Sequence, residues 1–166
     1  FNDTLFSLFD TQMSEKGIEF TRTIDVEHTE VLCDATKLRE IFLNILSNAL
    51  KYTPAGGKVE MRLKEIPSDR PGYAMYRTEI EDTGIGMSEE FIPHLFDEFT
   101  RERTSTDSHI NGIGLGMAIV KKIVDLMEGT ITVESKIGKG TKFTVTLPHR
   151  IAAVRDAEQS MNKKNE

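Results

Sequence analysis

Apolar residues recur along the chain at spacings that predict both helices and strands. The clearest helical stretch is 38–52, where apolar positions return every three or four residues and define one buried face. Asp34 is a candidate N-cap for this helix. Helical spacing also covers 1–16, before the helix-breaking Gly17, and a second strong pattern covers 115–127. A short helix, capped by Ser88 and interrupted by Pro93, is expected over 89–92.

Period-two alternation predicts strands between these helices. They are expected at 18–22, 31–33, 59–63, 73–82, 131–133 and 141–147. In the fourth of these, Asp82 falls on the same face as Thr78 and Ile80, so its carboxylate is expected to point into the core. The order of the elements predicts an α+β fold, a two-layer α/β sandwich with a mixed sheet and helices packed on one face.

Composition limits the class of protein. A chain of 166 residues is long enough for one domain with an ordinary core. The net charge of -6 argues against nucleic acid or an anionic membrane as the main partner, and no apolar run is long enough to cross a bilayer. The single cysteine, Cys33, excludes an intrachain disulfide and indicates a reducing compartment, and its apolar neighbours predict a buried thiol.

Polar residues on the helix at 38–52 form a first candidate site. Asn44, Asn48 and Lys51 follow one another at about one turn and share a face. A solvated helix face is the ordinary explanation, but such faces favour Glu, Lys and Gln, whereas Asn is a poor residue inside a helix. Amide oxygens on one stripe would suit a magnesium ion that keeps several waters and bridges phosphates. Spacing alone leaves both interpretations open.

A second candidate site lies at a strand end, where Asp82 is followed by Gly84 and Gly86. Asp and Gly are common in turns, so a plain strand-ending turn is one interpretation. An inward carboxylate is costly unless it is paired, however, and the exocyclic amine of adenine is a suitable donor. Thr141, expected on the inward face of the last strand, could support the same base through its hydroxyl.

Three alternating glycines precede the last predicted helix. Gly112, Gly114 and Gly116 would let the backbone approach phosphates at a helix N-terminus, which favours negative charge. The pattern is G-x-G-x-G after a polar loop, so it does not fit the dinucleotide fingerprint that follows a strand. The spacing from glycine to lysine does not fit a P-loop either.

Together, five segments resemble the motifs of the catalytic ATP-binding domain of sensor histidine kinases, in the GHKL ATPase superfamily with its Bergerat fold. They are the asparagine box 44–54, the first glycine box 82–87, the phenylalanine box 96–99, the second glycine box 112–118 and a last glycine turn 138–141. The resemblance implies a catalytic ATP-binding domain over 1–150, in which 1–16 are the end of a linker and the first helix. Residues 151–166 are expected to be a polar tail or linker.

The resemblance implies that ATP and Mg2+ are the ligands of this domain. Asn48 would coordinate the metal ion, Asn44 would lie near the same phosphates, and Lys51 would contact phosphate. Asp82 would accept a hydrogen bond from the adenine amine. The other implied nucleotide contacts are Tyr52, Gly84, Gly86, Gly112, Gly114, Gly116 and Thr141.

The resemblance also implies how the chemistry proceeds. Residues 101–111 would form an ATP lid anchored by Phe96 and Phe99, and Arg101 would neutralise charge on the transferring phosphate. Superfamily members such as gyrase and heat-shock ATPases carry a water-activating glutamate where this chain has Asn44. Because an amide is no general base near neutral pH, phosphoryl transfer is expected here rather than fast hydrolysis.

The implied partners lie outside this chain. A histidine on a separate dimerisation and phosphotransfer domain of the same parent protein would accept the phosphoryl group, and a response regulator would act downstream. The histidines of this chain do not occur in the family's acceptor pattern; they are His28, His94, His109 and His149. We therefore expect a cytoplasmic module without direct membrane contact, although its parent could be anchored in the bacterial inner membrane. The alternatives are a non-catalytic ATP-dependent interaction module and a GHKL ATPase of another branch.

Overall fold

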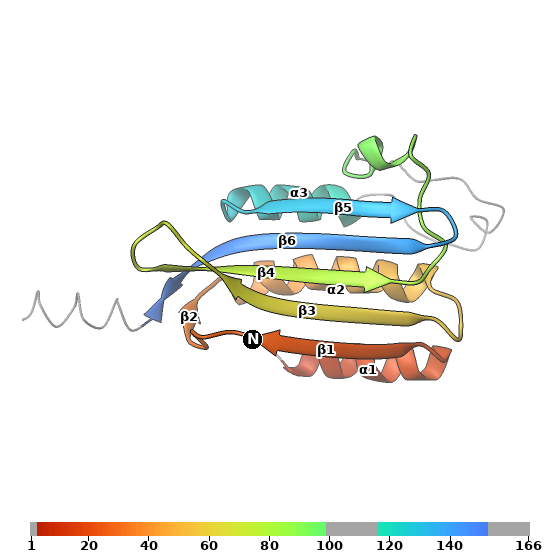
Figure 1. Ribbon diagram of the computed structural model, residues 1–166, viewed down its shortest axis with the longest axis horizontal. Coiled ribbons are helices and arrows are strands. Elements are labelled where there is room, and N and C mark those ends of the chain that lie inside the picture. Colours follow the sequence, from red (N-terminus) through yellow and green to blue (C-terminus); the bar gives the residue numbers. More distant parts are fainter. Residues whose placement is uncertain (1–2, 99–115, 153–166) are drawn as a thin grey trace, which may run out of the picture.

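The computed structural model describes residues 3–98 and 116–152. In chain order, the elements are α1 (Asp3–Lys16), β1 (Glu19–Asp25), β2 (Val31–Leu32), α2 (Ala35–Tyr52), β3 (Lys58–Ile66), β4 (Tyr73–Asp82), η1 (Ile92–His94), α3 (Gly116–Leu126), β5 (Thr130–Lys136) and β6 (Gly140–Ile151). The strands form one sheet, and α1, α2 and α3 lie behind it in the view of Figure 1. The predicted α+β sandwich, with helices on one face of a mixed sheet, is confirmed.

The sheet is mixed because its first pair of strands is parallel. Its order is β1-β3-β4-β6, and both β5 and β2 pair with the outer edge of β6. β1 and β3 run parallel, whereas the other pairs are antiparallel. The register of β4 and β6 places Thr141 directly opposite Asp82. Two residues that the sequence analysis assigned to one site are therefore cross-strand neighbours.

Alternation along β4 decides which of its side chains enter the core. Thr78, Ile80 and Asp82 are buried, as the period of two predicts. The fully buried core side chains come from the helices and the central strands: Phe9, Met13, Ile41, Ile45, Leu46, Val59, Val120, Val124 and Val145. Asp34 caps α2 as predicted, because its side chain accepts a hydrogen bond from the backbone N–H of Lys37 at 3.1 Å.

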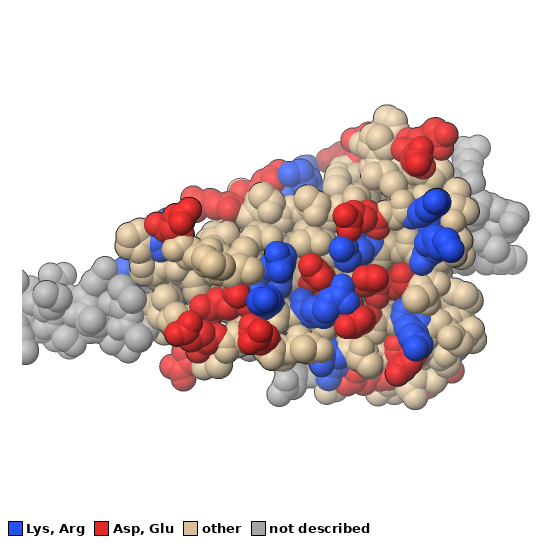
Figure 2. Space-filling view, viewed as in Figure 1, with Lys and Arg blue, Asp and Glu red and all other residues tan. Residues whose placement is uncertain are grey.

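The opposite face of the sheet is solvated and carries charges of both signs. Arg62 on β3 lies 2.9 to 3.2 Å from its three carboxylate partners, which are Glu60, Glu79 and Glu81. Figure 2 shows Lys and Arg interspersed with Asp and Glu over this face. Exposed pairs of this kind contribute at most about 1 kcal/mol each. Within the described ranges, no helix is long and apolar enough to cross a bilayer.

Three predictions are wrong at the periphery of the domain. Cys33 is exposed rather than buried, because it follows β2, a strand of only two residues at the sheet edge. The short helix expected after Ser88 is a turn followed by η1, in which Pro93 is the second residue. β6 continues to Ile151, beyond the predicted strand end at residue 147, and pairs there with Val31.

Candidate functional site

Asp82 ends β4 with its carboxylate inside the domain. The residue is only 8% exposed, and its Oδ1 atom accepts hydrogen bonds from the backbone N–H groups of Gly84 (2.8 Å) and Thr141 (3.2 Å). Within the described part of the chain, Oδ2 forms no hydrogen bond. Burial raises the pKa of the Asp82 carboxyl, although the two N–H bonds oppose this effect. The predicted inward carboxylate is confirmed, and one of its oxygens is available to a ligand.

The loop 82–87, which follows β4, is held by backbone groups of distant segments. The backbone N–H of Ile85 donates to the carbonyl of Tyr52 at the end of α2 (3.1 Å), and the N–H of Gly138 donates to the carbonyl of Ile85 (2.9 Å). The first of these bonds fixes the end of α2 beside the loop, and the second fixes the turn between β5 and β6. The asparagine box and the first glycine box are therefore adjacent in the fold.

Two glycines of this loop are required by close packing within the protein. A Cβ on Gly84 would lie 2.5 Å from the carbonyl oxygen of Tyr52 and 2.8 Å from Oδ1 of Asp82. Gly86 has a φ of +71°, and a Cβ there would overlap the carbonyl of Lys136. These close approaches are to the protein's own atoms. A nucleotide contact at either glycine stays a prediction.

Sequence reasoning missed Ser135 on β5. Its hydroxyl accepts a hydrogen bond from the N–H of Met87 (2.8 Å), donates to the carbonyl of Gly140 (2.9 Å) and lies 2.8 Å from Oγ1 of Thr141. Because Ser135 has one hydrogen and Gly140 receives it, the Thr141 hydroxyl donates to Ser135 and keeps its lone pairs for another donor. A serine in a strand is no sequence signal, since only the register of β5 and β6 brings it to Thr141.

One face of α2 presents the residues predicted to bind phosphate and metal. Asn44 and Asn48 are half-buried, whereas Lys51 is exposed. Nδ2 of Asn44 donates to the carbonyl of Glu40 at 2.7 Å, and its Oδ1 faces Gly116, where a Cβ would lie 2.9 Å away. The face of α2 therefore adjoins the first residue of α3. The side chains of Asn48 and Lys51 form no hydrogen bond or ion pair with another described residue.

Part of the predicted site lies outside the described residues. This part comprises Arg101, Gly112, Gly114, the predicted lid 101–111 and Phe99. Phe96, the other predicted lid anchor, is half-buried and packs against the core. Tyr52 is half-buried at the end of α2, and its predicted contact with the nucleotide stays a prediction.

Known proteins share this arrangement of sheet, helices and motifs. The sequence model of the histidine kinase-, DNA gyrase B-, and HSP90-like ATPases matches residues 33–151. The chain belongs to this ATPase family. The matched range includes α2, the loop 82–87 and the register between β4 and β6, and the domain therefore binds ATP as a member of an ATPase family.

Individual relatives narrow the family to sensor kinases. The autoinducer 2 sensor kinase/phosphatase LuxQ of Vibrio parahaemolyticus is 33% identical over 94% of this chain and 19% of the relative, so the chain spans about a fifth of that protein. The solved mycobacterial sensor histidine kinase MprB has a TM-score of 0.70 and 30% identity, covering 90% of this chain and 95% of the other. Full-length ShkA in complex with AMPPNP has a TM-score of 0.72 and 31% identity, covering 90% and 29%. The predicted resemblance to the catalytic ATP-binding domain of sensor histidine kinases is confirmed.

Proposed function

We propose that this domain binds Mg-ATP and transfers the γ-phosphoryl group to a histidine on a separate dimerisation and phosphotransfer domain of the same parent protein. The observation that carries the proposal is the buried Asp82 carboxylate, whose Oδ2 has no partner among the described residues. The bond between Ile85 and Tyr52 ties the loop after this carboxylate to the end of α2. A group suited to the base and a helix face suited to phosphates therefore belong to one surface.

Asp82 would select adenine by accepting a hydrogen bond from the exocyclic amine at Oδ2. The two N–H bonds to Oδ1 hold the carboxylate in one orientation, so little freedom is lost when the base binds. The lone pairs of the Thr141 hydroxyl provide a second acceptor on the neighbouring strand. Burial strengthens these hydrogen bonds, because water is excluded from competition for them.

The triphosphate would extend from the base towards α2 and the start of α3. Asn48 fits a magnesium ligand, because its amide is half-buried and uncommitted within the described residues. Lys51, about one turn further on, would contact phosphate as a point charge, and Asn44 would lie near the same phosphates. A magnesium ion held at Asn48 would supply charge neutralisation for the transfer.

The transfer itself depends on positioning rather than on a protein base. An imidazole nitrogen of the acceptor forms a bond to the γ-phosphorus with its own electron pair, and the bond from that phosphorus to ADP breaks. Asn44 stands where a hydrolytic enzyme would need a carboxylate, and its amide nitrogen is committed to the carbonyl of Glu40. Water is therefore not activated at this position, and hydrolysis without the acceptor is expected to be slow. The proposed charge neutralisation by Arg101 concerns a residue outside the described ranges.

The described histidines support an acceptor on another domain. His28 and His94 each pair with a carboxylate, at 2.9 and 3.1 Å, and His149 is 8% exposed. His28 lies in the segment between β1 and β2, His94 ends the three-residue helix η1, and His149 lies in β6. None of these three is therefore on a long helix, where the family's acceptor is expected. We propose that a response regulator receives the phosphoryl group next. A cytoplasmic location for this domain, in a parent that could be membrane-anchored, completes the proposal.

Mixing the domain with the separately produced dimerisation domain of its parent tests this proposal. With γ-labelled ATP and magnesium, we expect acid-labile, alkali-stable label on the acceptor domain within minutes. An acceptor variant that lacks its histidine should stay unlabelled, and the Asp82→Asn domain should transfer poorly at low ATP. If the domain binds ATP with normal affinity but never labels the acceptor at saturating ATP, it is a non-catalytic interaction module.

A further inference from the structure

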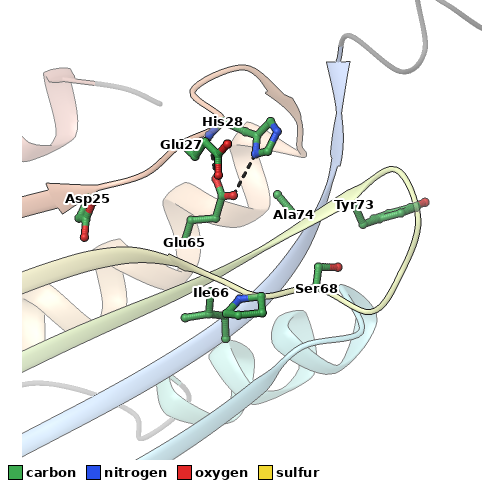
Figure 3. Close-up of a pocket in the computed structure, with 9 residues that line it drawn as sticks. Asp25, Glu27, His28, Glu65, Ile66, Ser68, Tyr73 and Ala74 are labelled. Atoms are coloured by element: carbon green, nitrogen blue, oxygen red, sulfur yellow. Dashed lines mark hydrogen bonds and ion pairs between the residues drawn. The ribbon is translucent and has the colours of Figure 1, made fainter.

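A second polar pocket lies at the end of the sheet opposite to Asp82. It is lined by Asp25 at the end of β1, by Glu65 near the end of β3 and by Tyr73 at the start of β4, and its volume is about 490 Å³. Because β4 runs from Tyr73 to Asp82, the whole length of this strand separates the pocket from the candidate nucleotide site. Figure 3 shows the pocket with the segment between β1 and β2 at its rim. The pocket is therefore a separate site from the one that contains Asp82.

Three side chains converge in this pocket with atoms that ligate metals. Ligand atoms of Glu27, His28 and Glu65 all lie within 4.8 Å of one another. Nδ1 of His28 is 2.9 Å from Oε2 of Glu65, and the backbone N–H of His28 donates to Oε1 of Glu65 at 2.8 Å. In Figure 3 the side chain of Glu65 reaches up from β3 towards Glu27 and the imidazole of His28.

Negative charge dominates the pocket. Asp25, Glu27 and Glu65 contribute three carboxylates, and within the described ranges none of them forms an ion pair with a lysine or arginine. The imidazole of His28 is the only basic group among the lining residues. Two carboxylates at this separation repel one another unless a cation lies between them. The pocket therefore lacks a counter-charge that a small cation could supply.

The backbone that carries these side chains is held in place before any ion binds. The hydroxyl of Tyr76 donates to the carbonyl of His28, and the N–H of Ala152 donates to the carbonyl of Glu30 at 3.3 Å. The segment between β1 and β2 is thereby fixed to β4 and to the end of β6. A site whose ligands are already ordered loses less entropy on binding than one on a free loop.

We propose that Glu27, His28 and Glu65 bind a divalent transition-metal ion of the Zn2+ class. Imidazole nitrogen and carboxylate oxygen both ligate zinc, and three protein ligands leave a fourth position that would open into the pocket for water. Magnesium and calcium prefer oxygen ligands alone, so they should bind more weakly here. The ion replaces the hydrogen bond between His28 and Glu65 and joins the segment before β2 to the end of β3.

Calorimetric titration of the untagged, nucleotide-free domain with zinc chloride tests the proposal. We expect one ion per chain, and a weaker response to magnesium chloride at the same concentration. Glu27→Gln removes a ligand whose side chain forms no hydrogen bond or ion pair within the described residues, so the variant should stay folded. We expect it to bind zinc at least roughly tenfold more weakly, and His28→Asn to do the same.

Two matched variants identify other sources of binding. His94→Asn removes a histidine whose ion-pair partner among the described residues is Asp97 alone, and it should leave the zinc affinity unchanged. Cys33→Ser removes the exposed thiol and should also have no effect. Absence of stoichiometric zinc binding overturns the proposal, and so does binding that survives Glu27→Gln and His28→Asn. If only a lysine-containing peptide occupies the pocket, the site recognises a protein partner and the metal assignment is wrong.

Discussion

Replacing Asp82 with asparagine changes one carboxylate oxygen into an NH2 group and keeps the size of the side chain. Oδ1 already accepts hydrogen bonds from Gly84 (2.8 Å) and Thr141 (3.2 Å), so the amide oxygen of the variant should occupy that position. The NH2 group then stands where Oδ2 stood. It presents a hydrogen-bond donor to the adenine amine, which is itself a donor.

The expected loss of affinity follows from this single bond. A hydrogen bond to a charged group is worth about 1.5 to 3 kcal/mol. Because about 1.4 kcal/mol corresponds to a factor of ten, ATP should bind the Asp82→Asn domain roughly ten- to one-hundred-fold more weakly. The variant can donate to the O6 carbonyl of guanine, so its preference for ATP over GTP should also narrow.

The free energy of unfolding should change in the opposite direction. Burial raises the pKa of the Asp82 carboxyl, so the folded domain binds this proton more tightly than the unfolded chain. Stability therefore falls as the pH rises from the ordinary carboxyl pKa to the raised one, and the cost persists at higher pH. Asparagine carries no charge, so the nucleotide-free variant should be at least as stable as the wild type at pH 7.5.

Calorimetric titration with ATP and urea unfolding without nucleotide measure both effects on the same preparations. Glu81→Gln is the matched control, because Glu81 is the adjacent carboxylate on the outer face and pairs with Arg62. It should leave ATP affinity unchanged. Unaltered affinity in Asp82→Asn, or a loss of affinity that only accompanies a loss of stability, would refute the assignment of Asp82 to the base.

Four further outcomes are expected. Asn48→Ala should abolish the magnesium dependence of ATP binding but spare adenosine binding, and an equal loss for both ligands would contradict the metal assignment. Thr53 is fully buried, and its hydroxyl has no hydrogen-bond partner within the described ranges. In urea unfolding, Thr53→Val should therefore raise the free energy of unfolding by about 1 kcal/mol, whereas Thr53→Ser should lower it. A valine variant that is less stable than the wild type would show that the hydroxyl has a hydrogen-bond partner. Gly84→Ala should cost about 1–3 kcal/mol of stability and weaken ATP binding. At Gly138 a Cβ meets nothing within 4 Å, but the φ of +79° strains any other residue, so Gly138→Ala should cost some stability and leave ATP affinity intact in the same titration. Burial lowers the pKa of His149, so protonation favours the unfolded chain, and the free energy of unfolding should fall below about pH 6.5. His149→Phe should remove this loss when urea unfolding at pH 8 is compared with unfolding at pH 5.5. An unchanged pH dependence in the variant would show that His149 is not its source.

The two elements with strict periodicity could be predicted from the sequence because one side of each is buried along its whole length. The spacing in α2 predicts its core face, and the alternation along β4 predicts that Asp82 points inward. The end of β6 was missed because Pro148 breaks the pattern. In the fold, Pro148 lies on the outer edge of β6 between the pairings to β5 and β2, where the proline's missing N–H leaves no partner unsatisfied.

The parts of the site that could not be predicted depend on contacts between distant segments. Ser135 enters the site only through the register of β5 and β6, and a lone serine carries no periodic signal. Cys33 was expected inside because its neighbours are apolar, but a two-residue edge strand has too little of the sheet around it to cover the thiol. Gly84 could be singled out from sequence, whereas the carbonyl that excludes its Cβ could not.

The way in which the loop 82–87 is anchored predicts how it tolerates random substitution. Its bonds to Tyr52 and Gly138 use the main chain of Ile85, whose side chain is 40% exposed, so this position should accept many residue types. Gly84 and Gly86 on either side should accept almost none. Saturation mutagenesis should therefore give tolerance that alternates along the loop. Apart from Asp82, a library for altered base preference should vary Ile85 and keep both glycines.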